Sequence, residues 1–456
     1  MSTPAYALIG HPLGHSLSPF IHRGLLQAAG LPGTYELIDL PPAELVSRAP
    51  ELLDRLAGFN CTIPYKEAIL PFLDALDPAA AAIGAVNTVW QRRGYNTDMA
   101  GFLADCPPLA GRRVLILGAG GVSRTLACAA AASGAAITLL ARRPRQAEAL
   151  AASLLTAWPG CQVTCPVSLD SWLETKPFAA NDPRPWILLN GTPVGMWPDT
   201  GGMPFPAEWL GAFSFVYDTI YNPAATRLVL AARSRGVAAR NGLGMLVGQA
   251  AAAERIWHPD ADFSADICGR LLRRLPQAIL HQSPLTLILI GYMGSGKTTA
   301  GRLLAKQLDL AFVDLDQSIE AATGQTIPEI FAARGEPAFR RLEQEQLAKV
   351  LRHSRGQVLA TGGGALLDPA AEAIVRAAPA LVIFLDVPLD VMRGRIGSGE
   401  GRPLLYEQGD DRFTSLYRQR RPRYQALADL QVEGVDSQAI AAAVAAYLGI
   451  QENEDL

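Results

Sequence analysis

The chain has 456 residues, of which 49% are hydrophobic and 18% are charged, and its formal net charge is −3. This length exceeds one ordinary hydrophobic core and predicts two or three domains, while the small net charge argues against nucleic acid or an anionic membrane as a partner. The first residues lack a basic segment leading into an apolar stretch, and the six cysteines form no Cys-x-x-Cys pair. We therefore expect a cytoplasmic protein with free thiols and without a membrane span.

Short apolar runs alternate with helical patterns along the chain, which predicts α/β domains with parallel sheets. In the first part, strands are expected at 6–10, 113–118, 136–141, 186–191 and 215–220. In the second part, strands are expected at 285–291, 312–316, 357–364 and 381–387. Proline-rich segments at 105–112 and 274–285 predict joints, the first before a new strand and the second between two halves of the chain.

Four motifs with polar residues interrupt the otherwise apolar sequence of about the first hundred residues: GHPLGHSLSPFIH, FNCTIPYKE, GAVNTV and GYNTDMAGF. Each motif alone is explained by a turn or a helix cap, where Ser, Asn and Asp beside Pro or Gly are common. Together they supply hydroxyl, amide, ammonium and carboxylate groups, on Ser16, Ser18, Thr62, Lys66, Asn87 and Asp98. Such a set suits a small polyhydroxylated acid as the ligand.

A glycine-rich loop, RVLILGAGGVSR, places Gly118, Gly120 and Gly121 directly after an expected strand and before a helix. Glycines there let the backbone turn tightly and approach a pyrophosphate, which then lies on the helix N-terminus. The next strand ends in Arg142 and Arg143, at the place where an acidic residue would bind the ribose 2′-hydroxyl of NAD. Guanidinium groups there favour the 2′-phosphate of NADP. The alternative is an ordinary strand–turn–helix with its arginines in a solvated loop.

A second loop, GYMGSGKT, matches the phosphate-binding pattern G-x-x-x-x-G-K-[ST] from Gly291 to Thr298 and follows an apolar strand. The backbone amides of such a loop bind nucleotide phosphates, Lys297 reaches the terminal phosphates, and Thr298 is a ligand for Mg²⁺. Downstream, FVDLDQSIE places Asp314 and Asp316 two residues apart at the end of the next strand, and so on one face. One carboxylate would act through the water shell of the metal, and the other would hold the acceptor hydroxyl.

The polar motifs, with NGTPVGM, YDTIYNP and NGLGMLVGQA, resemble those of shikimate dehydrogenase, and the resemblance covers residues 1 to about 275. It implies that Lys66 and Asp98 are the catalytic pair. Lys66 would supply a proton and a positive field to the alkoxide that forms when hydride reduces the ring ketone of 3-dehydroshikimate. The implied substrate-binding residues are Ser16, Ser18, Thr62, Asn87, Tyr221 and Gln249. Without the surrounding motifs, the alternative for Lys66 and Asp98 is an ion pair on the surface that contributes little to stability.

The resemblance also implies which residues bind NADP(H). These are Gly118, Ala119, Gly120, Gly121, Arg142, Arg143 and Gly242. The chain departs from the family at Ala141 and Gln146, where an asparagine and a second arginine are usual. Arg143 or Arg145 is expected to compensate for the missing arginine.

Further motifs, GEPAFRRLE, ATGGGALL, EGRPLL and RQRRPRY, resemble shikimate kinase in order and spacing over about 285–456. The implied catalytic residues are Lys297, Asp316, which binds and deprotonates the acceptor hydroxyl, and Arg402, which lies in a glycine-rich lid and stabilises the transferring phosphoryl group. The implied shikimate-binding residues are Arg340, Gly363, Gly364 and Arg420. The implied ATP-binding residues are Gly291, Gly294, Ser295, Gly296 and Thr299, with Thr298 and Asp314 for Mg²⁺. Adjacent Arg341 and Arg421 remain alternatives for the two substrate arginines.

Together these features predict an enzyme that reduces 3-dehydroshikimate with NADPH and phosphorylates the resulting shikimate with ATP and Mg²⁺. Its expected parts are an α/β substrate domain at 1–103, completed by helices at about 239–275, a Rossmann-type NADP domain at 104–238, a linker at 276–285 and a P-loop kinase domain with a parallel sheet at 286–456. The expected partners are these small molecules, and the oligomeric state is left open. Two alternatives stay open: a sensor that binds the ligands without turnover, and a dehydrogenase that prefers quinate.

Overall fold

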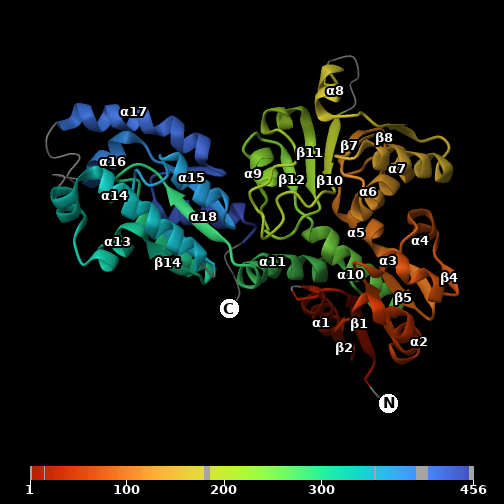
Figure 1. Ribbon diagram of the computed structural model, residues 1–456. Helices are drawn as coiled ribbons and strands as arrows, with labels where there is room; N and C mark the ends of the chain where they lie inside the picture. The colour runs from red at the N-terminus through yellow and green to blue at the C-terminus, as the bar shows by residue number, and fades with distance from the viewer. Residues whose placement is uncertain (1–2, 15, 179–184, 354–355, 397–408, 451–456) are drawn as a thin grey trace. The chain divides into compact units, whose positions relative to one another are not determined.

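The computed structural model describes residues 3–14, 16–178, 185–353, 356–396 and 409–450 (Figure 1). The chain forms two compact units. The first comprises Met1–Pro193, Glu208–Tyr221 and Val237–Leu275, and the second comprises Val194–Ala207, Asn222–Gly236 and Pro276–Leu456. In the described part of the chain, no helix has the length and apolar character needed to cross a membrane.

The segment predicted as a linker is largely helical. Helix α11 (Ala265–Gln282) runs through the boundary between the two units and contains Pro276 in its interior. The residues after this proline, QAILHQ, are mostly good helix formers, so the helix continues despite the lost N–H. The predicted linker at 276–285 therefore coincides over 276–282 with the last part of α11.

A mixed sheet with the order β2-β1-β3-β5-β6-β4 forms the N-terminal part of the first unit. Its strands are β1 (Ala5–Gly10), β2 (Thr34–Asp39), β3 (Gly58–Cys61), β4 (Ala75–Leu76), β5 (Thr88–Trp90) and β6 (Arg93–Tyr95). The accompanying helices are α1 (Ser18–Ala28), α2 (Leu45–Arg55), α3 (Tyr65–Ala68), α4 (Pro78–Ile83), α5 (Thr97–Asp105) and α10 (Leu243–Trp257), with short 3₁₀ turns at Pro42–Glu44 and Leu70–Phe72. Strand β1 is parallel to β2 and β3, whereas β5 is antiparallel to both of its neighbours.

A parallel sheet with the order β12-β11-β10-β7-β8-β9 forms the rest of the first unit. Its strands are β7 (Arg113–Leu117), β8 (Ala136–Leu140), β9 (Gln162–Thr164), β10 (Trp186–Asn190), β11 (Phe213–Asp218) and β12 (Ala238–Arg240). The helices α6 (Gly121–Ala132), α7 (Pro144–Ala157) and α8 (Leu169–Glu174) connect the strands β7 to β10. The chain leaves β7 toward β9 and returns to β10 on the other side of β7, so the strand order reverses there. In doubly wound sheets this point binds ligands, and the first glycine-rich loop lies at it.

The sheet of the second unit is parallel throughout, in the order β14-β15-β13-β16-β17. Its strands are β13 (Thr286–Ile290), β14 (Ala311–Asp314), β15 (Gln357–Ala360), β16 (Ala380–Asp386) and β17 (Leu430–Glu433). The unit's helices are α9 (Arg227–Arg233), α12 (Lys297–Leu308), α13 (Leu315–Thr323), α14 (Ile327–Arg352), α15 (Pro369–Arg376), α16 (Leu389–Ile396), α17 (Gly409–Leu427) and α18 (Ser437–Tyr447). The phosphate loop follows the central strand β13, as the predicted fold class requires.

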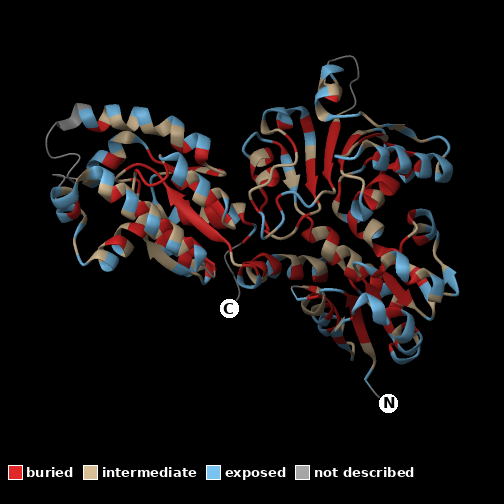
Figure 2. Cartoon of the chain, viewed as in Figure 1, coloured by how far each residue is buried: buried red, intermediate tan, exposed pale blue. Residues whose placement is uncertain are grey.

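The burial of the strands explains why they could be predicted from the sequence. Every residue of β7 after Arg113, and all of β10, β13 and β16, is buried (Figure 2). A parallel strand with both faces covered reads as a continuous apolar run, as in TLILI and ALVIFLD. The α/β class and the parallel sheets predicted from these runs are confirmed.

Candidate active sites

A polar cavity of about 580 Å³ lies in the first unit. All eight residues predicted as its catalytic and substrate-binding groups line it: Ser16, Ser18, Thr62, Lys66, Asn87, Asp98, Tyr221 and Gln249. They come from the loop after β1, the start of α1, the segment after β3, α3, the residue before β5, the first turn of α5, the loop after β11 and the middle of α10. The topology of the mixed sheet therefore brings together four motifs that are separate in the sequence.

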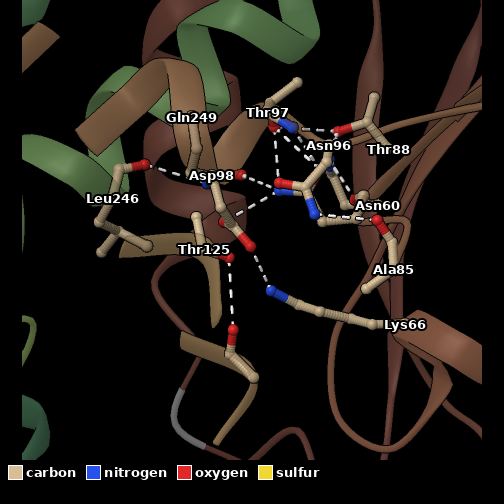
Figure 3. Close-up of polar contacts among 12 residues, drawn as sticks. Asn60, Lys66, Ala85, Thr88, Asn96, Thr97, Asp98, Thr125, Leu246 and Gln249 are labelled. Carbon is tan, nitrogen blue, oxygen red and sulfur yellow. Dashed lines mark hydrogen bonds and ion pairs between the residues drawn. The ribbon is translucent and has the colours of Figure 1, made fainter. Parts of the chain in front are cut away.

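Lys66 and Asp98 form an ion pair at the wall of this cavity, with Nζ 2.5 Å from Oδ2 (Figure 3). The lysine lies on α3 and the aspartate in the first turn of α5. Their side chains are 29% and 15% exposed, so this is not the solvated surface pair considered as the alternative. A largely dry ammonium beside a carboxylate can hold a proton at a fixed point in the cavity.

The carboxamide of Asn87 fixes the other side of Asp98. Its Oδ1 accepts a hydrogen bond from the backbone N–H of Thr97 at 2.7 Å, which leaves Nδ2 to donate to Asp98 Oδ1 at 2.9 Å and to Gln249 Oε1 at 3.4 Å. Gln249 in turn donates from Nε2 to the carbonyl of Leu246 at 3.0 Å. Figure 3 shows the side chain of Lys66 pointing toward Asp98. Each of the two Asp98 oxygens thus has a defined donor.

Close packing of α5 and α10 makes this arrangement possible. A Cβ added to Gly101 on α5 would lie 2.5 Å from the backbone nitrogen of Gln249, and one added to Gly248 would lie 2.9 Å from the α-carbon of Gly101. The two helix backbones are therefore in direct contact. Side chains larger than hydrogen at these positions would separate Asp98 from Gln249.

Several residues that line the cavity escaped prediction. They are Asn60, Val122, Thr219, Met245 and Leu246, among others. Asn60 is the most informative, because it is buried in β3, accepts a hydrogen bond from Tyr35 Oη at 2.7 Å and donates to the carbonyl of Asn87 at 3.1 Å. Its position in the apolar sequence of β3, GFNC, was the signal that could have identified Asn60, because a buried amide needs hydrogen-bond partners.

The first glycine-rich loop fits a dinucleotide. Gly118 has φ +96°, a conformation that L side chains rarely adopt, and a Cβ there would lie 2.7 Å from Ser123 Oγ. At Gly120 and Gly121, by contrast, an added Cβ meets no atom within 4 Å. The chain's own packing does not fill the space beside these two glycines at the start of α6, which leaves room for a phosphate at the helix N-terminus. Ala119 lies within the same loop.

Arg142 and Arg143 follow β8, the strand next to β7, and both are exposed. Within the described ranges, neither makes a hydrogen bond or an ion pair with another side chain, so their guanidinium groups are available to an anion. Gly242 lies elsewhere: it caps α10, lines the polar cavity and approaches Thr219, whose carbonyl oxygen would be 2.1 Å from an added Cβ. Its assignment to the cofactor stays a prediction.

A second cavity, of about 690 Å³, lies in the second unit beside the phosphate loop. Most of the residues predicted there line it: Gly294, Gly296, Lys297, Thr298, Thr299, Asp314, Asp316, Arg340, Gly363, Gly364 and Arg420. Gly291 and Ser295 belong to the same loop behind this lining, and Arg402 lies outside the described residues. Of the adjacent arginines, Arg340 and Arg420 line the cavity, whereas Arg421 binds Asp386.

The phosphate end of this cavity holds the cation and the hydroxyl expected of a nucleotide site. Lys297 Nζ donates to the carbonyls of Gly291 and Tyr292 at 2.9 and 3.0 Å. Thr298 Oγ1 donates to Asp314 Oδ2 at 2.9 Å, which places a hydroxyl and a carboxylate oxygen side by side, both of a kind that Mg²⁺ accepts as ligands. Arg395, which was not predicted, also lines the cavity and donates to the carbonyl of Gly294 at 3.1 Å.

Asp314 and Asp316 do not lie on one face of a strand, so this prediction was wrong. Strand β14 ends at Asp314, whose carboxylate accepts hydrogen bonds from the N–H groups of Asp316 and Gln317 and so caps α13. Asp316 therefore lies in the first helical turn. Both carboxylates still line the second cavity.

The acceptor end of the cavity combines Asp316 with Arg340 and a buried acid that was missed, Glu343. Arg340 Nη1 donates to Glu343 Oε2 at 2.6 Å. Burial and the neighbouring charge of Asp314 raise the pKa of Asp316, and burial also raises the pKa of Glu343. A carboxylate with a raised pKa beside two arginines can accept a proton from a hydroxyl while an anionic substrate is held.

Comparisons with known proteins agree with this geometry. The shikimate dehydrogenase (NADP(+)) of Moorella thermoacetica is 40% identical over 268 residues, which are 56% of this chain and 88% of that protein. The chain belongs to the shikimate dehydrogenase family. Residues 8–89 match the family model of the shikimate dehydrogenase substrate binding domain. Residues 293–448 match the family model of shikimate kinase, so the chain is a fusion of the two.

Solved structures resemble the dehydrogenase part. One is the Thermus thermophilus shikimate 5-dehydrogenase in complex with NADP(H) and shikimate, 35% identical with a TM-score of 0.50, which covers 59% of this chain and 99% of its own. Another is a chorismate mutase/shikimate 5-dehydrogenase fusion protein from Clostridium acetobutylicum, 31% identical with a TM-score of 0.53, which covers 61% of this chain and 99% of its own. The predicted family and the Rossmann-type fold are confirmed.

Proposed function

We propose that this chain catalyses two consecutive reactions: the reduction of 3-dehydroshikimate to shikimate with NADPH, and the phosphorylation of shikimate to shikimate 3-phosphate with ATP. The observation that carries the proposal is the pair of cavities. One holds Lys66 and Asp98 among hydroxyl and amide groups, and the other joins a phosphate loop to Asp316 and two arginines. The product of the first reaction is the acceptor of the second.

In the dehydrogenase part, the chain's residues handle the proton. NADPH, when bound beside the first glycine-rich loop, supplies the hydride that forms the new C–H bond. Lys66 donates a proton to the former carbonyl oxygen and stabilises the negative charge that develops there. Asp98 holds the ammonium group in place, and Asn87 holds Asp98. The serines, Thr62 and Tyr221 are proposed to bind the ring hydroxyls and the carboxylate.

In the kinase part, Asp316 is proposed to accept the proton of the acceptor hydroxyl. Arg340 and Arg420 would bind the carboxylate of shikimate, because planar guanidinium groups match a carboxylate. Lys297 would exchange its loop carbonyls for phosphate oxygens and neutralise their charge. We propose Mg²⁺ at Thr298 and Asp314, where it would neutralise further phosphate charge when bound. A cytoplasmic location suits the six cysteines, all of which are free thiols.

A coupled assay on the purified chain tests the proposal. With 3-dehydroshikimate, NADPH, ATP and Mg²⁺ supplied together, NADPH should be consumed and shikimate 3-phosphate should form. Lys66→Ala should abolish NADPH oxidation but should still phosphorylate added shikimate, whereas Lys297→Ala should lose only phosphorylation. Ligand binding without either turnover would reject the enzyme in favour of a sensor, and faster reaction with quinate in the reverse direction would reject shikimate as the preferred substrate.

A further inference from the structure

Two consecutive arginines of α17 point to different partners. Arg420 lines the second cavity, beside the phosphate loop, and its Nη1 donates to the carbonyl of Gly363 at 3.3 Å. Arg421 instead forms a two-pronged contact with Asp386, with Nε 3.1 Å from Oδ1 and Nη2 2.6 Å from Oδ2. Successive residues of a helix are about 100° apart around its axis, so fixing the direction of one fixes that of the other.

Asp386 is well placed to fix this direction. It is the last residue of β16, next to the central strand β13, and its side chain is only 6% exposed. Besides Arg421, its oxygens accept hydrogen bonds from Tyr417 Oη at 3.2 Å and from Gln431 Nε2 at 2.9 Å. Tyr417 and Arg421 are four residues apart and so lie on one face of α17. A single rigid carboxylate thus binds two successive turns of the helix.

We propose that Arg421 and Asp386 are positioning residues of the kinase reaction, which set the rotation of α17 about its axis and thereby hold Arg420 at the acceptor end of the cavity. This inference rests on the proposed function, in which Arg420 binds the carboxylate of shikimate. Tyr424, one turn beyond Arg420, also donates to the carbonyl of Gly363, so both residues depend on the same helix rotation. Arg420 forms no ion pair with an acidic side chain among the described residues, so its direction depends on the helix that carries it and on the carbonyl of Gly363.

A purely structural role for the Arg421–Asp386 pair predicts something different. Arg423 offers the comparison, because it also pairs with an acid at 2.6 Å, Glu372 of α15. Arg421 and Arg423 have similarly exposed side chains, at 39% and 35%. If α17 needs only ion pairs for stability, removing either arginine should have the same effect.

The test measures Michaelis constants for Arg421→Gln, Arg421→Lys and the matched control Arg423→Gln in the full-length chain. We expect Arg421→Gln to raise the KM for shikimate about tenfold, because misplaced binding groups are costly. Its KM for ATP and all constants of the dehydrogenase reaction should stay within twofold of wild type. Arg421→Lys keeps the charge but loses the two-pronged contact with Asp386. Its KM for shikimate should therefore lie between that of wild type and that of Arg421→Gln. Arg423→Gln should leave the KM for shikimate unchanged.

Three results would overturn the inference. The first is a KM for shikimate in Arg421→Gln within twofold of wild type. The second is an equal rise in the KM for shikimate in Arg423→Gln, which would mean that the contact of Arg421 with Asp386 serves only the stability of α17. The third is a rise in the KM for ATP instead, which would mean that Arg421 contacts the nucleotide.

Asp386→Asn provides a second route, since it should reproduce the Arg421→Gln phenotype, and combining the two substitutions should add little. Failure of the proposed function would look different, because wild type itself would not phosphorylate shikimate.

Discussion

Gly101 and Gly248 touch through their backbones: a methyl group on Gly248 would lie 2.9 Å from the α-carbon of Gly101. This contact joins the helix that carries Asp98 to the helix that carries Gln249. Gln249 Oε1 is 3.4 Å from Asn87 Nδ2, near the limit of a hydrogen bond, so a small separation of the helices would break it. The geometry of the dehydrogenase site therefore depends on two residues that have no side chain.

Gly248→Ala should reduce dehydrogenase turnover at least tenfold, because forcing a methyl group between packed helices moves backbone atoms. It should also lower the stability of the first unit by about 1–3 kcal/mol. The measurements are initial rates of NADPH oxidation and thermal unfolding. Gly211→Ala is the matched control, since a Cβ there meets nothing within 4 Å, and it should change neither. Equal effects of the two substitutions would contradict the proposed role of the helix contact.

Asp98→Asn should lower the kcat of ketone reduction by about 10²–10⁴-fold, the usual contribution of a positioned acid–base group. The substitution removes the charge that holds the Lys66 ammonium and puts an amide opposite the Nδ2 donor of Asn87. Phosphorylation of added shikimate by the same protein should be unchanged. Asp54→Asn, which removes an exposed partner of Arg92, should leave both rates unchanged. Normal turnover in Asp98→Asn would exclude this residue from catalysis.

The choice between NADP and NAD can be tested at Arg142. Arg142→Ala should raise the KM for NADPH roughly 10–100-fold, the equivalent of a lost charge-assisted hydrogen bond, while the KM for NADH changes little. Steady-state rates with each cofactor measure the ratio. Arg143→Ala should act in the same direction if this residue compensates for Gln146, whereas Arg145→Ala should have no effect. Equal losses with NADPH and NADH would place these arginines outside the 2′-phosphate site.

Both glycine-rich loops, and the polar residues that the structure gathers in the first cavity, could be predicted because their signals are local. The apolar runs at β7, β10, β13 and β16 are buried, so the parallel sheets could be predicted from these runs, although the strand order could not. Glycine spacing marked the phosphate-binding turns for a similar reason, because their backbone conformation restricts the residue type. Ser16, Lys66 and Asp98 stand out as polar residues between apolar segments.

Other parts of the sites depend on contacts that the local sequence does not carry. Glu343 lies in RRLEQEQ, where nothing distinguishes a buried acid from a surface charge until α14 packs against the cavity. The contact of Gly101 with Gly248 joins residues 147 positions apart in the chain. The start of α13, by contrast, was predictable: Asp314 is a typical N-cap, and recognising it would have moved Asp316 from the strand to the helix.

The raised pKa of Asp316 gives the kinase reaction a distinctive pH dependence. Asp316 must be ionised to accept a proton, so the rate should fall as the pH drops below its pKa. Burial and the charges of Asp314 and Glu320 raise that pKa above the ordinary value of 3.8, because each disfavours the ionised form. The acid limb of kcat/KM for shikimate should therefore lie at higher pH than for an ordinary aspartate.

Glu320→Gln tests the sign of this effect. The carboxylate of Glu320 accepts a hydrogen bond from the N–H of Ile327 at 3.0 Å, which a glutamine oxygen can retain, so the change removes mainly the charge. With one negative charge fewer, the pKa of Asp316 should fall and the acid limb should move to lower pH. Glu345→Gln removes one charge from the same unit on an exposed side chain that does not line the cavity, and it should leave the limb where it is. A shift to higher pH in Glu320→Gln, or an equal shift in both variants, would show that Asp316 does not set the limb. The dehydrogenase profile of each variant, recorded on the same preparation, should match that of wild type, because Glu320 and Glu345 both belong to the second unit.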